Sequence, residues 1–191
     1  TKLNHEIEYY ENSSGHLVAW VNVTSLSDTE NTTLYMYYGN PDCGSQENVL
    51  GVWDSNYIMV QHLDETQDSH YDSTSNNNDG TPMNGLNQLA AGQIDGADDF
   101  AGDNDYIDVP YDASMELGDE NEVTVSAWFN PDNLGIVEGI VEQYDWQAGK
   151  GSFIFRKDNQ KLMFGIVQGA SWDKAEKDNV FTDTDTTIHC V

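Results

Sequence analysis

Short runs of β-branched and aromatic residues, each bounded by Gly, Asn, Asp or Ser, recur along most of this 191-residue chain. Such runs favour strands, and no window of about 11 to 18 residues carries the apolar stripe of an amphipathic helix. Short strands at this spacing favour an all-β, antiparallel sandwich. The expected strands are residues 6–10, 17–23, 33–38, 57–60, 105–109, 123–129, 139–142, 152–156 and 161–167.

The expected strands fall into two groups that separate near residue 60. Residues 39–45 are rich in turn-forming residues, and a second polar stretch covers residues 66–85. We therefore expect a smaller β-rich domain over residues 1–60 and a larger sandwich over residues 61–191. No repeat of about 20 to 50 residues is visible, which argues against solenoids and propellers.

The charge of the chain is strongly negative and unevenly distributed. It carries 34 Asp and Glu against 7 Lys and Arg, a formal net charge of −27, and no Lys or Arg lies between Lys2 and Lys150. Such a charge repels nucleic acid and anionic lipid, and no apolar run reaches the length of about 20 residues that spans a bilayer. We expect no nucleic acid partner and no direct membrane insertion. Abundant Asp suits either a saline solvent or a bound cation, and both interpretations remain open.

Three Asn-x-Ser/Thr triplets begin at Asn12, Asn22 and Asn31. In an exported protein such triplets are acceptors for N-linked glycans, so they favour an extracellular location at the cell surface. The two cysteines, Cys43 and Cys190, have no spacing typical of a metal site. They form either one disulfide bond or two free thiols.

Several sequence segments, in order and spacing, resemble the laminin-G-like, concanavalin A-like jelly-roll family. They are His62–Glu65, residues 72–81, residues 92–97, residues 100–110 and residues 124–131. Residues 1–60 resemble the C-terminal part of an uncharacterised β-rich domain that precedes such modules in archaeal and bacterial surface proteins. This second resemblance is carried by residues 19–21, 35–41 and 52–54.

These resemblances imply an exported, multi-domain surface protein whose lectin-like sandwich binds carbohydrate or a protein partner, often with a structural calcium ion. Two departures from the family pattern concern the ends of the chain. The first domain begins partway through its usual pattern, and residues 188–191 resemble the start of a strand after which such modules continue. Either the chain is a fragment of a longer protein, or a neighbouring subunit supplies the missing strand in a head-to-tail assembly.

Loop residues with oxygen-bearing side chains are the candidate calcium ligands, because calcium prefers carboxylate, amide and carbonyl oxygens. They are Asp64, Asp72, Asn76, Asn78, Asp79, Asp103 and Asp105. The alternative interpretation of residues 76–80 is a turn in which Asn and Gly adopt positive φ.

Sugar-binding sandwiches commonly stack an aromatic ring on the apolar face of a pyranose. Trp146 and Trp172 lie in polar, glycine-containing segments and are the candidate ligand-binding residues. Trp20, Trp53 and Trp128 lie within or at the ends of apolar runs, so we expect them in the core.

No catalytic motif is present. The Glu-x-Asp-x-x-Glu pattern of sandwich glycosidases is absent, and the nearest group, Glu138 with Glu142 and Asp145, has helical rather than strand spacing. We therefore expect a non-enzymatic extracellular surface protein with a lectin-like module that binds carbohydrate or a surface protein, supported by calcium. The alternative is a structural subunit of a filament, sheath or surface coat that assembles by β-strand complementation.

Overall fold

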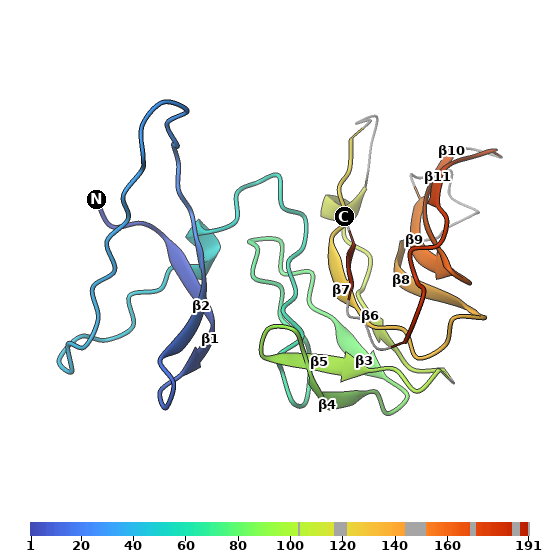
Figure 1. Ribbon diagram of the computed structural model, residues 1–191, viewed down its shortest axis with the longest axis horizontal. Helices are drawn as coiled ribbons and strands as arrows, with labels where there is room; N and C mark the ends of the chain where they lie inside the picture. Colours follow the sequence, from blue (N-terminus) through green and yellow to red (C-terminus); the bar gives the residue numbers. More distant parts are fainter. Residues whose placement is uncertain (103, 117–121, 144–151, 169–170, 185–187, 191) are drawn as a thin grey trace. The chain divides into compact units, whose positions relative to one another are not determined.

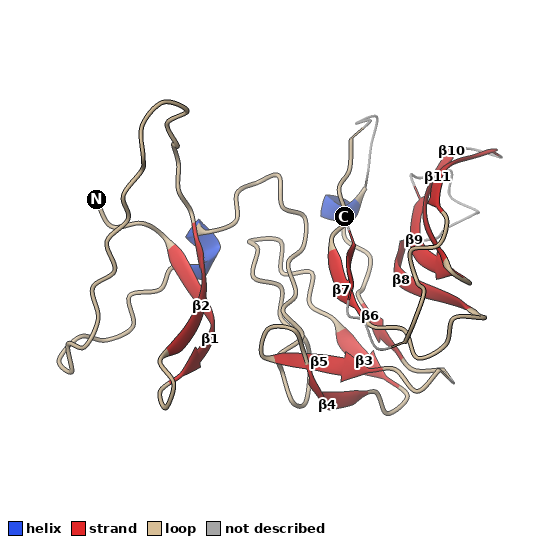
Figure 2. Cartoon of the chain, in the orientation of Figure 1, coloured by secondary structure: helices blue, strands red, loops and turns tan. Residues whose placement is uncertain are grey.

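The structure is a computed structural model that describes residues 1–102, 104–116, 122–143, 152–168, 171–184 and 188–190. The chain divides into two compact units, Thr1–Ser114 and Met115–Val191, which we call the N-terminal and C-terminal units. The regular structure is almost entirely strand, and every strand pair is antiparallel (Figures 1 and 2). The predicted all-β, antiparallel fold class is confirmed. The expected domain boundary near residue 60 falls inside the N-terminal unit and stays a prediction.

Among its described residues, the N-terminal unit contains three two-stranded sheets. Strand β1 (His5–Glu11) pairs with β2 (His16–Val21) as a hairpin, β3 (Thr81–Met83) pairs with β6 (Tyr106–Asp108), and β4 (Asn87–Ala91) pairs with β5 (Gly96–Asp99). The 3-10 turn η1 (Val49–Gly51) lies between the hairpin and the later strands in sequence, and a second one, η2 (Ala113–Met115), covers the position in the sequence where the N-terminal unit gives way to the C-terminal unit. In β1 the register shifts between Ile7 and Tyr9, which leaves Glu8 as the extra residue of a β-bulge.

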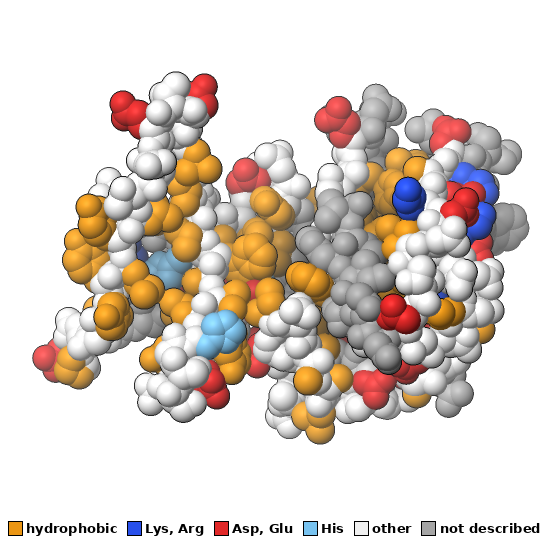
Figure 3. All heavy atoms as spheres, viewed as in Figure 1, with side chains coloured by type: hydrophobic (Ala, Val, Ile, Leu, Met, Phe, Trp, Pro, Cys, Tyr) orange, Lys and Arg blue, Asp and Glu red, His pale blue; other side chains and the backbone are white. Residues whose placement is uncertain are grey.

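Two predicted strands of this unit are wrong, because neither finds a neighbouring strand. Some backbone groups of residues 57–60 instead bond to loop side chains: the Val60 N–H donates to Asp72 Oδ1, and the Ile58 carbonyl accepts from the Asn76 and Asn78 amides. Residues 33–38 lie in a long loop, where Tyr35, Tyr37 and Tyr38 are 79%, 92% and 86% exposed. Hydrophobic side chains, orange in Figure 3, are accordingly widespread on the visible surface of the unit.

The C-terminal unit is built on a meander. Strands β8 (Val137–Gln143), β9 (Ser152–Asp158), β10 (Lys161–Gln168) and β11 (Ser171–Lys177) form one sheet in the order β11-β10-β9-β8. Strand β7 (Ala127–Phe129) pairs separately with β12 (Ile188–Cys190). The turn between β9 and β10 places Asn159 at a φ of 54°, a conformation that asparagine tolerates better than most residues.

A small aromatic core holds the C-terminal unit together. Phe155 and Phe181 are 2% and 0% exposed, and their half-buried neighbours include Phe129, Leu162 and Phe164. Burying one large side chain contributes about 1.5 to 3 kcal/mol, so this cluster supplies much of the hydrophobic stabilisation of the unit. Lys and Arg side chains, blue in Figure 3, gather on the visible face over this sheet. Within the described residues, no helix has the length and apolarity needed to cross a membrane.

Candidate functional site

Strand β1 presents two glutamates to the interior of the N-terminal unit. Glu6 and Glu8 are two residues apart, a spacing that places strand side chains on one face. Their side chains are only 9% and 6% exposed. Glu8 is the bulge residue, and bulges commonly re-aim a side chain. Two carboxylates are therefore buried side by side and need polar partners.

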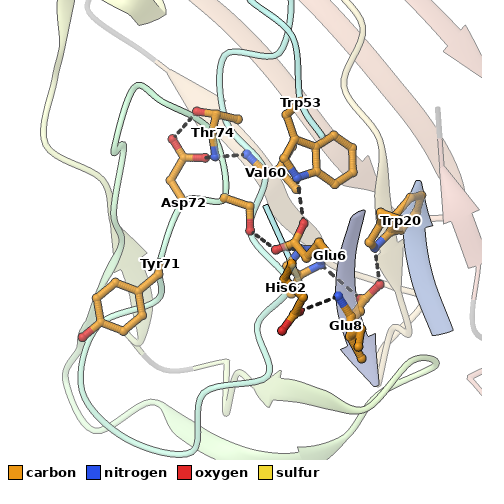
Figure 4. Close-up of polar contacts among 12 residues, drawn as sticks. Glu6, Glu8, Trp20, Trp53, Val60, His62, Tyr71, Asp72 and Thr74 are labelled. Carbon is orange, nitrogen blue, oxygen red and sulfur yellow. Dashed lines mark hydrogen bonds and ion pairs between the residues drawn. The ribbon is translucent and has the colours of Figure 1, made fainter. Parts of the chain in front are cut away.

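His62 lies between these two carboxylates (Figure 4). Its Nε2 is 3.2 Å from Glu6 Oε1, its Nδ1 is 3.2 Å from Glu8 Oε1, and its side chain is 12% exposed. The Nε2 contact has the distance of an ion pair but not the alignment of a hydrogen bond. The Ser73 hydroxyl donates to Glu6 Oε1 over 2.6 Å.

Two indoles complete the cluster. Trp53 Nε1 donates to Glu6 Oε2 over 2.8 Å, and Trp20 Nε1 donates to Glu8 Oε2 over 2.5 Å. The two indole rings pack with centroids 5.3 Å apart, and Trp53 also packs edge-on against Tyr57 at 5.0 Å. Trp20 nevertheless remains 39% exposed. We call Glu6, Glu8, Trp20, Trp53 and His62 the Trp20 site, because Trp20 is its solvent-facing member.

Asp72 organises the loop beside this site (Figure 4). Its Oδ1 accepts hydrogen bonds from the N–H groups of Val60 and Thr74, and its Oδ2 accepts from the Thr74 hydroxyl and the Asn78 N–H, all at 2.7 to 2.9 Å. A carboxylate has about four lone-pair positions, so these four donors saturate it. This buried aspartate builds the loop with the chain's own donors, which argues against Asp72 as a calcium ligand.

The other predicted calcium ligands also have partners within the chain. The Asn76 and Asn78 amides donate to the Ile58 carbonyl, Asp79 Oδ1 accepts the Asp72 N–H, and Asp105 Oδ2 accepts the Ala101 N–H. Asp103 lies outside the described residues. Partial burial, and next the Glu65 carboxylate, raise the pKa of Asp64. Over the described part of the chain, no three His, Cys, Asp or Glu side chains are grouped so as to hold a metal ion.

A second histidine of this unit is also held between two carboxylates. His70 is fully buried, with Nδ1 2.8 Å from Glu65 Oε2 and Nε2 3.0 Å from Asp98 Oδ2. The Gln88 amide lies 3.1 Å from His70 Nε2. Burial raises the pKa of Asp98 to about 6, although the nearby His70 opposes this shift. The two carboxylates flank opposite edges of the imidazole, so they do not converge on a common point where a cation could bind.

Of the predicted sugar-binding residues, Trp146 lies outside the described residues. The backbone of Trp172 pairs with Val167 in β11, and its side chain is not described. The prediction that Trp20 and Trp128 belong to the core is wrong, since they are 39% and 50% exposed. Trp53 is half-buried, and its predicted place in the core stays a prediction.

Sequence reasoning overlooked Glu6, Glu8, His62 and Trp20 as site residues. A signal for them was present: Glu-Ile-Glu on a predicted strand puts two carboxylates on one face. A tryptophan on the next strand of a hairpin is then within reach of that face. The contribution of His62, more than 50 residues away in sequence, has no local signal.

The three Asn-x-Ser/Thr triplets differ in their surroundings. Asn12 and Asn31 are exposed. The Asn22 amide donates to the carbonyls of Gly51 and Val52 over 3.0 and 3.1 Å, so it ties the end of β2 to η1.

The cysteine pairing stays a prediction. Cys43 is exposed and free, and the backbone of Cys190 lies opposite Ala127 in β12. The side chain of Cys190 is not described, and the two cysteines belong to different units.

Residues 1–79 match the model of a domain of unknown function, DUF2341. The resemblance of the first part of the chain to an uncharacterised domain is thus confirmed, with a match that continues past residue 60. No curated protein and no solved structure matches the chain. The laminin-G-like resemblance of residues 61–191 stays a prediction.

Proposed function

We propose that this chain belongs to a non-enzymatic extracellular protein of the cell surface and binds carbohydrate through the exposed face of Trp20. The observation that carries this proposal is the fixed yet accessible indole: Glu8 holds its N–H, Trp53 packs against it, and 39% of the residue stays exposed. A ring held in this way offers an apolar face to a pyranose without first losing rotamer freedom.

The electrostatics narrow the class of sugar. The N-terminal unit contains Lys2 as its single Lys or Arg, while acidic residues occur throughout it. A uronate or a sulfated sugar would meet repulsion at this surface, whereas a neutral or amino sugar would not. The exposed glycan acceptors Asn12 and Asn31 support the extracellular location.

Calcium support of this function is a separate part of the proposal. The saturated Asp72 carboxylate does not fit a calcium ligand. We propose that sugar binding at Trp20 does not require calcium, because Glu8 and Trp53 hold the indole. If calcium binds elsewhere in the chain, chelation should leave sugar binding at Trp20 unchanged while it alters thermal stability.

The test is a screen of the 191-residue chain against neutral, amino and acidic oligosaccharides, followed by tryptophan variants. Trp20→Ala should lower the affinity for the selected sugar about tenfold or more, because the stacking surface is lost. Trp128→Ala is the matched control, since Trp128 is also exposed but lies in the C-terminal unit.

A double variant, Trp146→Ala with Trp172→Ala, distinguishes the Trp20 face from a lectin-like site in residues 61–191. If the double variant loses sugar binding and Trp20→Ala keeps it, the binding site lies in the C-terminal unit. Absence of binding to any sugar in the screen would contradict the proposal as a whole.

A structural subunit is the second candidate function, and one observation favours it. Residues 33–38 have the sequence of a strand, lie outside any sheet, and expose three tyrosines almost completely. Such a segment is suited to pairing with a sheet edge of another copy. Light scattering should then show assembly of the wild-type chain that is lost when Tyr35 and Tyr37 are replaced by Ser. A monomer of 21.3 kDa at high concentration would count against this candidate.

A further inference from the structure

We infer that Glu8 and His62 are positioning residues for Trp20: His62 fixes the Glu8 carboxylate, and Glu8 fixes the indole. This inference deepens the proposed function and rests on it for its binding measurement, but the orientation of Trp20 can be measured without any sugar.

Glu8 is placed to act through Trp20 rather than on a ligand. Its side chain is 6% exposed, and its Oε2 is occupied by the Trp20 N–H. A carboxylate this deeply buried cannot reach sugar hydroxyls in solvent. The β-bulge of β1 supplies the local geometry, because Glu8 is the residue without a partner opposite it on β2.

The partners of the two glutamates are unequal. Glu6 accepts hydrogen bonds from Trp53 and Ser73 in addition to facing His62. The Glu8 carboxylate contacts Trp20 and His62. Removing His62 therefore leaves Glu6 with two donors but leaves Glu8 with the indole alone, so Trp20 should lose its orientation before Trp53 does.

Residues 3–149 contain no lysine or arginine, so no such cation from this segment can take the place of His62 beside the two glutamates. Both ring nitrogens of His62 face a glutamate oxygen at 3.2 Å, so one imidazole spans the two carboxylates. The ring also packs beside Trp20 and Trp53, with centroid distances of 6.4 and 6.3 Å. His62 thus contacts every other member of the Trp20 site. Glu8 connects His62 to the exposed indole through its hydrogen bond with Trp20.

The first experiment records the indole N–H signals of Trp20 and Trp53 by NMR in the full 191-residue chain. Glu8→Ala should shift the Trp20 signal and accelerate its hydrogen exchange about tenfold or more, since a charge-assisted hydrogen bond is lost, while the Trp53 signal stays near its wild-type position. Glu8→Gln should restore much of the protection, because its amide oxygen can still accept the indole N–H. Glu11→Ala is the matched control, as Glu11 is an exposed residue of the same strand.

His62→Ala should reproduce the effect of Glu8→Ala on Trp20, and His62→Gln should restore part of it. A Trp20 signal and exchange rate unchanged in both alanine variants would overturn the inference. Equal changes at Trp20 and Trp53 would also overturn it, because they would indicate general loosening rather than positioning. If the alanine variants do not fold, the wild-type exchange rate decides: protection of the Trp20 N–H supports the inference, and exchange as fast as in free tryptophan overturns it.

The second experiment measures the affinity for the sugar found by the screen. Glu8→Ala should weaken binding about tenfold, close to the effect of Trp20→Ala, and Glu8→Gln should recover most of that loss. Unaltered affinity in a Glu8→Ala protein whose indole has shifted would overturn the positioning role. If no sugar binds the wild-type chain, the proposed function fails, and the indole measurements still decide whether Glu8 and His62 hold Trp20.

Discussion

The carboxylates of the N-terminal unit are met by histidine, indole and backbone N–H groups, whereas those of the C-terminal sheet are met by lysine and arginine. Glu6 and Glu8 share His62, and Asp72 is saturated by four neutral donors. In the C-terminal unit, by contrast, Lys157 Nζ lies 2.8 Å from Glu138 Oε2 across the β8–β9 ladder.

This difference follows from where the cations occur in the sequence. Between Lys2 and Lys150 the chain has no Lys or Arg, so any acid buried there must use neutral donors or histidine. Neutral donors have fixed directions, and they build a network that specifies one loop conformation. Cross-strand ion pairs act within a sheet that the backbone ladder already defines. The acidic N-terminal unit therefore gains conformational order from its buried acids, whereas the C-terminal unit pairs its acids with cations in a sheet that is already defined by its backbone.

The largest effect is expected from removing the Asp72 carboxylate. Asp72→Ala leaves buried donors without acceptors, so it should destabilise the N-terminal unit by about 3 kcal/mol or more. Urea unfolding is followed through the indole N–H NMR signals of Trp53 and Trp128, which report on the N-terminal and C-terminal units separately. Asp54→Ala is the control, because exposed Asp54 accepts a single local hydrogen bond from Asn56 and its loss should cost about 0.5 kcal/mol. Equal costs in the two variants would contradict the saturated-carboxylate argument.

The next largest effect should come from Lys157 in the C-terminal unit. This lysine is 0% exposed and also donates to the Ile136 carbonyl over 2.9 Å. Lys157→Met leaves Glu138 without its cation and should destabilise this unit alone, by about 2 to 4 kcal/mol. Lys174→Met, at a side chain that is 54% exposed, should change stability by less than about 0.5 kcal/mol. A similar loss of stability in both units would contradict a role of Lys157 that is confined to the C-terminal unit.

A smaller effect should appear in the pH dependence of the N-terminal unit. Burial raises the pKa of Asp98 to about 6 from an ordinary value of 3.8, so the folded state holds this proton more tightly than the unfolded state. Its contribution to stability is therefore greatest below pH 3.8 and declines as the pH rises toward about 6. Asp98→Asn should remove this decline. The difference between wild-type and variant unfolding free energies over that range is the measurement, and a difference independent of pH would contradict it.

The smallest effect concerns salt. Raising the ionic strength should stabilise the N-terminal unit by a few tenths of a kcal/mol, roughly, by screening repulsion among its many acids. The exposed pair of Lys161 and Asp178, 3.2 Å apart, should be weakened by a similar amount. Opposite shifts of the two unfolding midpoints with added salt would support an electrostatic difference between the two units. Parallel shifts would count against an electrostatic difference between the units.

Much of the fold could be predicted because strand patterns are local. The runs at residues 6–10, 152–156 and 161–167 correspond to β1, β9 and β10. The charged strand β11 escaped prediction because its Ser-Trp-Asp-Lys-Ala-Glu-Lys sequence has no apolar alternation, and it forms as the outer strand of a meander. Residues 33–38 carry a strong strand pattern without a partner, which shows that propensity alone does not make a sheet.

The candidate site is harder to predict from the sequence than the fold. Its parts come together over long separations: Trp53 contacts Glu6 across 47 residues, and Ser73 contacts Glu6 across 67. The apolar run around Trp20 predicts a place in the core. The structure places it at the edge of a two-stranded hairpin, where a single sheet cannot cover both of its faces.

The connectivity of the two units also has a consequence for how the chain folds. In the C-terminal unit, each strand of the β8-β9-β10-β11 meander pairs with its neighbour in sequence, so loop closure is inexpensive. The N-terminal unit must bring β1 to residues more than 40 positions away before its buried glutamates find partners. Because folding slows as contacts become less local, the C-terminal sheet should refold first, although a ribosome would synthesise it after the N-terminal unit. During synthesis, the slower N-terminal unit can therefore begin to fold before the C-terminal unit is made. Refolding by dilution from denaturant starts both units at the same time.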